Sequence, residues 1–315
     1  MSTEITIAGA AGFVGSHLAR RLIKDGYSDI HLVMREEESP GDIGDTSAVS
    51  VVRTDLKKET SISAIADTKM LVNLAYAKDD FDGNLKMAAN IIKAAEEGQI
   101  RRIIHISTAV ACGFHRGGKI SETTTPCPLP GYQQNKLMIE EMLKAELPAQ
   151  AELVIIRPSM IIGAGGRGLD FIVNRMLSKP WRSRVVYWLL KNRRVNFVAV
   201  ENVVEAIMLF VKLPHIVGRE IYITSDDDDA DNYYGRVERL IRLYLEKPFV
   251  RPDVGLPAAC LRILFRLMPA HSPADLVYLS DKLSGMGYKR KVSLKESIHS
   301  AIKDCPDKAI KAGVE

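Results

Sequence analysis

This chain of 315 residues is poor in several features that mark particular classes of protein. Its formal net charge is only +4, too small by itself to indicate a nucleic-acid partner. No uninterrupted apolar run approaches the roughly 20 residues that a membrane-spanning helix needs. The first apolar run, residues 5–8, is short and leads directly into glycines, so we do not expect a signal peptide.

Cysteine is sparse as well. Cys112, Cys127, Cys260 and Cys305 are widely separated, with no Cys-x-x-Cys pair and no histidine at metal-ligand spacing. This distribution argues against a disulfide framework and against a cysteine metal site. We expect buried, reduced thiols, no bound metal and a cytoplasmic location.

The first half of the sequence alternates apolar runs of strand length with helical patterns. We expect strands at 5–8, 30–34, 49–52, 70–75, 102–106 and 153–156, and helices at 13–24, 85–97 and 132–146. This alternation predicts an α/β fold, a doubly wound parallel sheet with helices on both faces.

The second half is less regular. A glycine-rich break at 163–168 precedes helical patterns at 169–177, 201–212, 233–245, 257–268 and 294–303. We expect a dinucleotide-binding Rossmann domain over 1–165 and a smaller, mainly helical substrate lobe over 166–315, with about 195–224 returning to the sheet. The acidic run at 226–229 is interpreted as a solvated loop.

A glycine cluster follows the first strand and opens the first helix. Gly9, Gly12 and Gly15 provide a tight turn, let the backbone approach a pyrophosphate, and place free helix N–H groups beside it. A structural strand–helix turn is the alternative, but the position at the first strand–helix junction favours nucleotide binding.

The choice of cofactor is made at the end of the second strand. An acidic residue there binds the ribose 2′-hydroxyl of NAD, but this strand ends in Met34 and Arg35. Arg35 could pair with a 2′-phosphate, or it could be an exposed arginine among Glu36, Glu37 and Glu38. We predict NADP in preference to NAD.

Three Tyr-x-x-x-Lys matches occur: Tyr132/Lys136, Tyr187/Lys191 and Tyr278/Lys282. Residues four apart share a helix face, so the spacing lets a phenol and an ammonium act together. Tyr132 begins a helix 24 residues after Thr108, which directly follows a strand. Because strand carboxyl ends face the ligand crevice, we expect Thr108 and Tyr132 at one site. Tyr187, and Tyr278 in an expected late helix, are interpreted as packing residues.

With these motifs on one chain, the sequence resembles an extended short-chain dehydrogenase/reductase over nearly its whole length. The resemblance implies that Thr108, Tyr132 and Lys136 are catalytic, with Tyr132 as general acid/base. Tyr76 stands where the family usually has the last alanine of Leu-Ala-Ala. The expected cofactor site comprises Gly9, Gly12, Phe13, Val14, Gly15, Arg35, Asp55, Leu56, Leu74, Ala75, Tyr76, Asn84, Tyr132, Lys136, Pro158 and Ser159.

The second half resembles more particularly the sugar-nucleotide epimerases and 4-keto-sugar reductases of polysaccharide synthesis, at 192–203, 221–226 and 287–294. Two positions depart from that pattern. Met160 stands where many epimerases have a substrate-binding asparagine. Val195 stands at the place of a diphosphate-binding arginine, and Arg194, one residue early, is the candidate substrate contact.

A basic stretch around Arg194 has two interpretations. Its cations would suit an anionic diphosphate, or they could form the solvated face of an amphipathic helix. They are Arg182, Arg184, Lys191, Arg193 and Arg194. Trp181 and Trp188 in the same stretch permit contact with a membrane surface, although buried packing is the commoner fate of such residues.

Taken together, the sequence predicts a homodimeric, NAD(P)-dependent epimerase or reductase that acts by hydride transfer on a nucleotide-activated 4-keto sugar. The Tyr–Lys pair serves both reactions, so it does not choose between them. One alternative is an NADPH-dependent ketone reductase of the hydroxysteroid or dihydroflavonol kind, with residues 257–265 lining an apolar pocket. Another is a non-catalytic NADP-binding protein.

Overall fold

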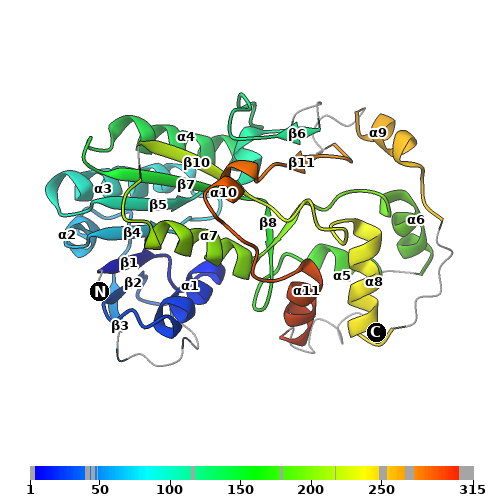
Figure 1. The fold of residues 1–315 in the computed structure, drawn as a ribbon, viewed down its shortest axis with the longest axis horizontal. Coiled ribbons are helices and arrows are strands. Elements are labelled where there is room, and N and C mark those ends of the chain that lie inside the picture. The colour runs from blue at the N-terminus through cyan, green and yellow to red at the C-terminus, as the bar shows by residue number, and fades with distance from the viewer. Residues whose placement is uncertain are drawn as a thin grey trace. The chain divides into compact units, whose positions relative to one another are not determined.

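The computed structural model describes residues 4–39, 43, 47, 49–114, 118–177, 180–216, 218–247, 254–266 and 273–304 (Figure 1). The chain divides into two compact units. Unit 1 comprises 1–113, 128–157 and 204–222, and unit 2 comprises 114–127, 158–203 and 223–315. The chain thus passes between the units several times, whereas the sequence suggested one boundary near residue 165 and one returning segment.

Unit 1 is built on a seven-stranded sheet in the order β10-β7-β5-β4-β1-β2-β3. The strands are β1 (Ile5–Ala8), β2 (Ile30–Met34), β3 (Val49–Arg53), β4 (Met70–Asn73), β5 (Arg102–Ile106), β7 (Glu152–Pro158) and β10 (Arg219–Thr224). Neighbouring strands from β7 to β3 run parallel. The order reverses between β1 and β4, which makes the end of β1 the switch point where such sheets bind ligands. This confirms the predicted doubly wound α/β fold.

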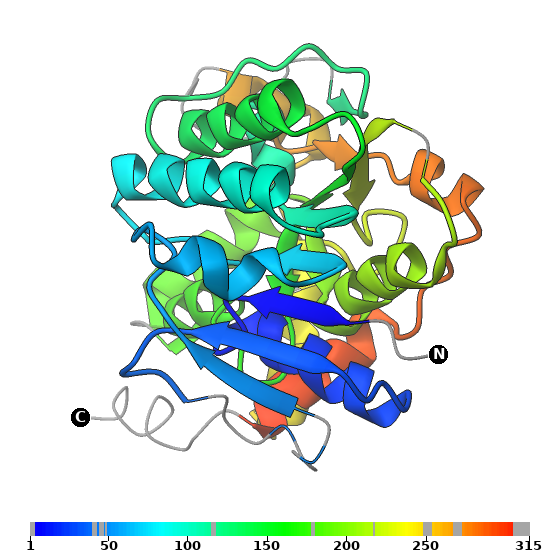
Figure 2. The ribbon, with the colours of Figure 1, turned by 90° about the vertical axis from the view of Figure 1, so that its left-hand side faces the viewer.

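Helices cover both faces of this sheet (Figure 2). One face packs against α2 (Ser61–Ala66), α3 (Phe81–Glu97) and α4 (Tyr132–Glu146). Because strand side chains alternate, Ile7, Leu32 and Val72 point to the other face, where they are also fully buried. There α1 (Phe13–Lys24) packs on β1 and β2, and its Arg21 pairs with Glu205 of α7 (Val200–Lys212) at 2.6 Å.

Unit 2 is mainly helical, as predicted. Its helices are α5 (Asp170–Leu177), α6 (Pro180–Leu190), α8 (Tyr234–Tyr244), α9 (Ala258–Arg266), α10 (Asp281–Gly285) and α11 (Leu294–Lys303). Two short parallel pairs join β8 (Met160–Ile162) to β9 (Phe197–Ala199), and β6 (Lys119–Ile120) to β11 (Val277–Tyr278). A core of its own joins these elements, with Phe197, Tyr234 and Leu294 almost fully buried.

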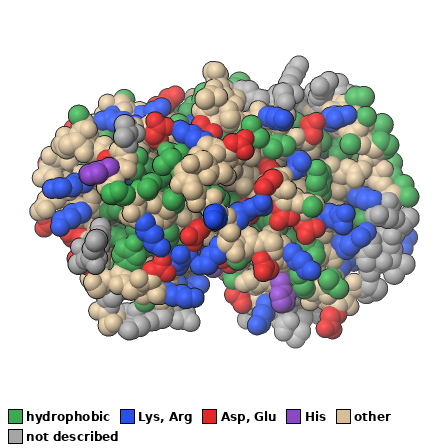
Figure 3. Space-filling view, in the orientation of Figure 1, with side chains coloured by type: hydrophobic (Ala, Val, Ile, Leu, Met, Phe, Trp, Pro, Cys, Tyr) green, Lys and Arg blue, Asp and Glu red, His purple; other side chains and the backbone are tan. Residues whose placement is uncertain are grey.

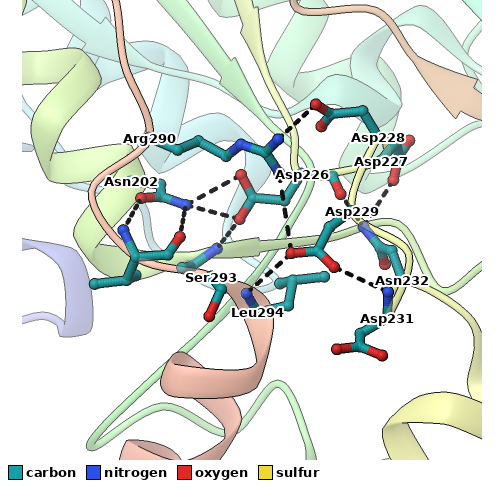
Figure 4. A network of polar contacts seen from close by, with 12 residues as sticks. Asn202, Asp226, Asp227, Asp228, Asp229, Asp231, Asn232, Arg290, Ser293 and Leu294 are labelled. Carbon is teal, nitrogen blue, oxygen red and sulfur yellow. Dashed lines mark hydrogen bonds and ion pairs between the residues drawn. The ribbon is translucent and has the colours of Figure 1, made fainter.

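The acidic run of unit 2 is only in part the solvated loop that the sequence suggested: Asp228 is exposed, but its two predecessors are buried. Asp226 and Asp227 are only 1% and 3% exposed. The Asp226 carboxylate accepts hydrogen bonds from the Ala199 N–H and from the Asn202 amide (Figure 4). Asp227 accepts from the Tyr278 N–H at 2.7 Å. Burial raises the pKa of each aspartate to about 6, against these hydrogen bonds. The run therefore holds distant backbone segments of unit 2 together.

Two other expectations are wrong in detail. Tyr278 lies on a short strand, β11, and not in a helix. Cys127 and Cys260 are exposed, and only Cys112 is buried among the described cysteines, because the other two lie in an extended loop and on the outer side of α9. Cys305 lies outside the described residues.

On the face seen in Figure 3, basic and acidic side chains are interspersed, in keeping with the small net charge. Arg182 and Arg184 of α6 are exposed, as are Trp181 and Trp188, whose exposed fractions are 61% and 45%. Within the ranges that the structure describes, no helix combines the length and the apolar character that crossing a bilayer requires.

Candidate active site

Two glycines at the junction of β1 and α1, Gly9 and Gly15, leave no room for a side chain. Gly9 has φ +81°, and a Cβ on it would lie 2.8 Å from the backbone N of Ala75. A Cβ on Gly15 would lie 2.4 Å from the carbonyl oxygen of Gly9. Gly12 is the N-cap of α1 and supplies no side-chain acceptor, so the N–H groups of the first turn are open to an external anion.

A cavity of about 540 Å³ lies over this turn, within unit 1. Its walls come from the glycine turn and from the loops that follow β2, β3 and β4. Eight predicted cofactor residues line it: Gly9, Gly12, Arg35, Asp55, Leu56, Leu74, Ala75 and Tyr76. The sequence interpretation missed Glu38, Thr54, Lys57, Ala77, Lys78, Asp80 and Met87, which also line it. All but Met87 lie within eight residues after the end of a strand. A search of the residues that follow each predicted strand would therefore have found them.

Arg35 is already engaged by acidic neighbours. Its Nη2 lies 2.6 Å from Glu38 Oε1, and its Nη1 lies 3.3 Å from Glu37 Oε1. The backbone N–H of Arg35 also donates to Glu38. Arg53 Nη1, at the end of β3, donates to the carbonyl oxygens of Arg35, Glu36 and Glu38. These hydrogen bonds fix the shape of the turn that follows β2. A carboxylate therefore lines the cavity beside the arginine.

The loops after β3 and β4 are joined by an ion pair at the cavity wall. Lys57 Nζ lies 3.2 Å from Asp80 Oδ2, while the other oxygen of Asp80 caps α3 through the Gly83 N–H. Asn84, predicted to contact the cofactor, is 2% exposed and does not line the cavity. It instead holds the loop, because its side-chain amide exchanges two 2.8 Å hydrogen bonds with the backbone of Ala77.

Thr108, Tyr132 and Lys136 converge in unit 1. Thr108 follows β5, and Tyr132 and Lys136 lie one turn apart on α4. A hydrogen bond between the side chains of Thr108 and Tyr132 lowers the pKa of the phenol, but desolvation outweighs it and the pKa is raised overall. The Tyr132 ring remains 44% exposed, so a ligand can reach it.

Tyr76 links this cluster to the cavity. Its ring lies edge to face with the Tyr132 ring, with centroids 5.3 Å apart. The Lys136 Nζ atom lies 4.2 Å from the Tyr76 ring centroid and donates to the Ile106 carbonyl at 3.2 Å. Burial lowers the pKa of Lys136 to about 8, while the Glu140 carboxylate raises it. Lys136 is therefore a cation at and below neutral pH.

A buried histidine lies beneath the cluster. The Asn73 carbonyl accepts from the Ala75 N–H, so its amide nitrogen is the donor to Nδ1 of His105, at 3.0 Å. Burial, together with the Lys136 charge, lowers the pKa of His105 well below 6.5. The sequence interpretation gave this neutral histidine no role. Its place on β5, three residues before Thr108, was the available signal.

Glu140 anchors the helix that carries the Tyr–Lys pair. It lies four residues after Lys136, is fully buried, and accepts a hydrogen bond from the Ser107 hydroxyl. Arg157, from the end of β7, donates to the same carboxylate and, through Nη1, to the Cys112 sulfur at 2.8 Å. The sequence interpretation missed Glu140, which sits one helical turn beyond the motif it supports.

The remaining predicted residues lie elsewhere. Phe13, Val14 and Gly15 form the first turn of α1 and do not line the cavity. Three others belong to unit 2 or to its boundary: Pro158, Ser159 and Arg194. Arg194 is engaged within unit 2, where it donates to the Asp227 carbonyl and lies 4.7 Å from the Tyr233 ring centroid. Among the described residues, no group of three or more His, Cys, Asp or Glu side chains is placed to hold a metal ion.

Comparison with known proteins decides the family. A profile of the NAD-dependent epimerase/dehydratase family matches residues 5–223, more than half of the chain. The chain belongs to this family. The extended short-chain dehydrogenase/reductase resemblance of the sequence is thereby confirmed.

Individual relatives of this epimerase/dehydratase chain are distant. A UDP-glucose 4-epimerase from Lactobacillus helveticus is 24% identical over 44% of the chain and 46% of that protein. Sterol demethylase protein B from Methylococcus capsulatus is 26% identical over 56% and 58%. The chain thus matches only about half the length of these curated relatives.

One solved structure of similar fold is the Bordetella bronchiseptica enzyme WbmH in complex with NAD+. The two structures align with a TM-score of 0.73 and 16% sequence identity, over 96% of this protein and 98% of WbmH. At this identity the likeness establishes the fold alone.

Proposed function

We propose that this protein is a nicotinamide-dinucleotide-dependent epimerase of nucleotide sugars, with Tyr132 as its general acid/base. One observation carries the proposal. Tyr132 and Lys136 both contact the ring of Tyr76, which lines the cavity over the glycine turn, and Thr108 is hydrogen-bonded to Tyr132. The family profile and the UDP-glucose 4-epimerase relative support the choice of substrate class.

The cavity fits a dinucleotide. The absence of a Cβ at Gly9 and Gly15 and the open N–H groups of α1 suit a pyrophosphate, and a cavity of about 540 Å³ offers the space. Asp55 and Leu56 would hold the adenosine end. A dinucleotide held there would supply the hydride acceptor and donor of the reaction.

Tyr132 would move the proton that accompanies this hydride. Its phenol must lose a proton to take one from a sugar hydroxyl. The Thr108 hydrogen bond favours that ionised form against burial, and we expect the positive charges of Lys136 and of a bound oxidised nicotinamide to favour it further. Thr108, already hydrogen-bonded to Tyr132, would hold the reacting sugar oxygen in line with the phenol. In an epimerase the proton and hydride return to the sugar, so the cofactor is not consumed.

For the cofactor, the contacts of Arg35 favour NAD over the NADP that the sequence suggested. A 2′-phosphate would have to displace Glu38 from Arg35 and then remain beside two carboxylates. A ribose 2′-hydroxyl could instead donate to Glu38, as an acidic residue near this strand end does for NAD. The NAD+ bound to WbmH is in keeping with this choice.

A second candidate is the oxidation of an apolar alcohol to a ketone, or the reverse reduction. The sterol demethylase relative, which matches 56% of the chain, is the observation that favours it. The Tyr–Lys pair would serve this reaction equally.

A paired substrate assay separates these candidates. With NAD+ present, purified protein should interconvert a UDP-hexose with its 4-epimer, measured by NMR, without net cofactor reduction. Tyr132→Phe should abolish turnover and keep NAD+ binding within a few-fold. Tyr187→Phe is the matched control, because Tyr187 has the same spacing to a lysine but lies in the core of unit 2. Reduction of 3-ketosteroids with NADH, or oxidation of 3-hydroxysteroids with NAD+, in the absence of UDP-hexose turnover would favour the second candidate. A fully active Tyr132→Phe would remove Tyr132 from the mechanism.

A further inference from the structure

Tyr76 holds an unusual position for a residue on a cofactor loop. It lies three residues beyond β4, and its ring meets both members of the Tyr–Lys pair. The Lys136 ammonium lies over the ring face, 4.2 Å from the centroid, which is within cation–π range. The Tyr132 ring meets it at an interplanar angle of 89°, the favoured edge-to-face arrangement.

The Tyr76 hydroxyl points to a ligand. Its oxygen is buried, yet it has no hydrogen-bond partner among the described residues. A buried hydroxyl without a partner costs free energy, and native structures rarely leave one unexplained. Tyr76 also lines the cavity that contains the glycine turn. A molecule bound in that cavity could supply the missing partner.

We propose that Tyr76 is a positioning residue of this active site: its ring holds the Lys136 ammonium and the Tyr132 ring in place, and its hydroxyl bonds the dinucleotide. The inference rests on the proposed function, since it assigns Tyr76 a part in the same site. It also gives the tyrosine a role that a smaller residue at this position could not have.

The two tyrosines of the site then have separate tasks. Burial, with the neighbouring Tyr132 and Asp79, raises the pKa of Tyr76 to about 12, so its hydroxyl keeps its proton and remains a donor. Tyr132 has a hydrogen bond from Thr108 that favours its ionised form, and its side chain is the more accessible to substrate. Tyr76 positions Tyr132 and Lys136, and Tyr132 exchanges the proton with the substrate.

Several groups besides Tyr76 act on the charge of Lys136. Glu140, on the same helix, favours the cation, and the Ile106 carbonyl accepts a hydrogen bond from the ammonium. His105, on β5, is neutral. Burial opposes the cation. The Tyr76 ring is thus one of three features that keep the ammonium charged, and its removal should have a measurable effect.

The change in the pKa of Lys136 when the Tyr76 ring is removed tests the proposal in the ligand-free protein. With ¹³C-labelled lysine, the Lys136 signal is assigned from its loss in Lys136→Met and is followed through a pH titration by NMR. Tyr76→Leu keeps the site apolar but removes the ring face, so the pKa of Lys136 should fall by about 1. Tyr76→Phe keeps the ring and should leave it unchanged. A rise in Tyr76→Leu would mean that Tyr76 only excludes water, and no change would mean that the ring contact has no energetic effect; either result overturns the ring's role.

The hydroxyl is tested by calorimetry with NAD+. Tyr76→Phe should weaken NAD+ binding roughly 2- to 10-fold, the usual worth of one hydrogen bond, with little change in unfolding temperature. Tyr27→Leu, at a half-buried tyrosine after α1, is the control and should alter neither measurement. Unchanged NAD+ affinity in Tyr76→Phe overturns the hydroxyl's role. Neither readout requires turnover, so failure here is distinct from failure of the epimerase assay.

Discussion

Arg157 and Glu140 form a buried ion pair in unit 1, with Arg157 Nη2 2.5 Å from Glu140 Oε2 and the two side chains only 2% and 1% exposed. The pair ties the end of β7 to the middle of α4. Because α4 also carries Tyr132 and Lys136, the ion pair fixes the position of these two residues relative to the sheet. Because both side chains are buried, each charge depends on the other for its stabilisation.

Removing one partner of this pair should be costly. Glu140→Gln leaves the Arg157 charge buried and uncompensated, so the free energy of unfolding should fall by about 3–5 kcal/mol. Urea unfolding followed by circular dichroism measures it. Asp170→Asn, which breaks the exposed Arg167–Asp170 pair of 3.0 Å, is the control and should cost less than about 1 kcal/mol. Equal losses in the two variants would contradict the assigned importance of the buried pair.

The glycine turn should tolerate no side chain at Gly15. A Cβ there would meet the Gly9 carbonyl oxygen at 2.4 Å, so Gly15→Ala must shift the turn. We expect at least a tenfold loss of NAD+ affinity by calorimetry and a destabilisation of about 1–3 kcal/mol. Gly26→Ala is the control: its φ of +82° brings strain, but nothing lies within 4 Å of the added Cβ. It should lower stability by about 1–2 kcal/mol and leave NAD+ binding intact. Equal NAD+ affinity in both variants would argue against this turn as the pyrophosphate site.

Local patterns made much of unit 1 predictable. The helices at 13–24 and 132–146 were predicted at the bounds that the structure has, because apolar spacing and a preceding glycine mark them. The strands that feed the site are short apolar runs between turn residues, and on each side of the switch point they pair in chain order. The convergence of Thr108 and Tyr132 followed from strand-end position alone.

Features that depend on distant backbone were not predictable. Four consecutive aspartates look solvated, but Asp226 and Asp227 accept hydrogen bonds from the N–H groups of Ala199 and Tyr278, which lie far away in the sequence. Tyr278 is a strand residue because it pairs with residue 120, more than 150 positions away. The engagement of Arg35 by Glu38 depends on a turn shape that Arg53 fixes from β3.

Freeing Arg35 should shift the cofactor preference. Glu38→Gln removes the carboxylate that lies 2.6 Å from the guanidinium, so a 2′-phosphate gains a partner and loses a repulsive neighbour. The ratio of NADP+ to NAD+ affinity should rise roughly tenfold, about 1.4 kcal/mol, in competitive binding measurements. Glu36→Gln makes the same charge change at the adjacent turn and should alter the ratio much less. If wild-type protein already binds NADP+ more tightly than NAD+, the NAD assignment is wrong.

His105 should give the protein a specific loss of stability in mild acid. Its folded pKa lies well below 6.5, so the unfolded chain takes up the proton first, and stability present above pH 6.5 is lost as the pH falls. The loss attributable to His105 should reach about 2 kcal/mol between pH 7 and pH 5. Asp226 and Asp227 act in the opposite sense, because their folded pKa of about 6 exceeds the unfolded value and protonation near pH 6 then favours the folded state.

The contribution of His105 is therefore obtained by comparing the pH dependence of the unfolding free energy in wild type and variants, since all of them keep Asp226 and Asp227. Urea unfolding at pH 7, 6 and 5 should show that His105→Gln loses about 2 kcal/mol less than wild type over this range. His215→Gln, at a side chain that is 90% exposed, should follow the wild-type curve. Parallel curves for His105→Gln and wild type would mean that His105 accepts its proton in the folded protein as easily as in the unfolded chain. That result would contradict the lowered pKa assigned to this buried histidine.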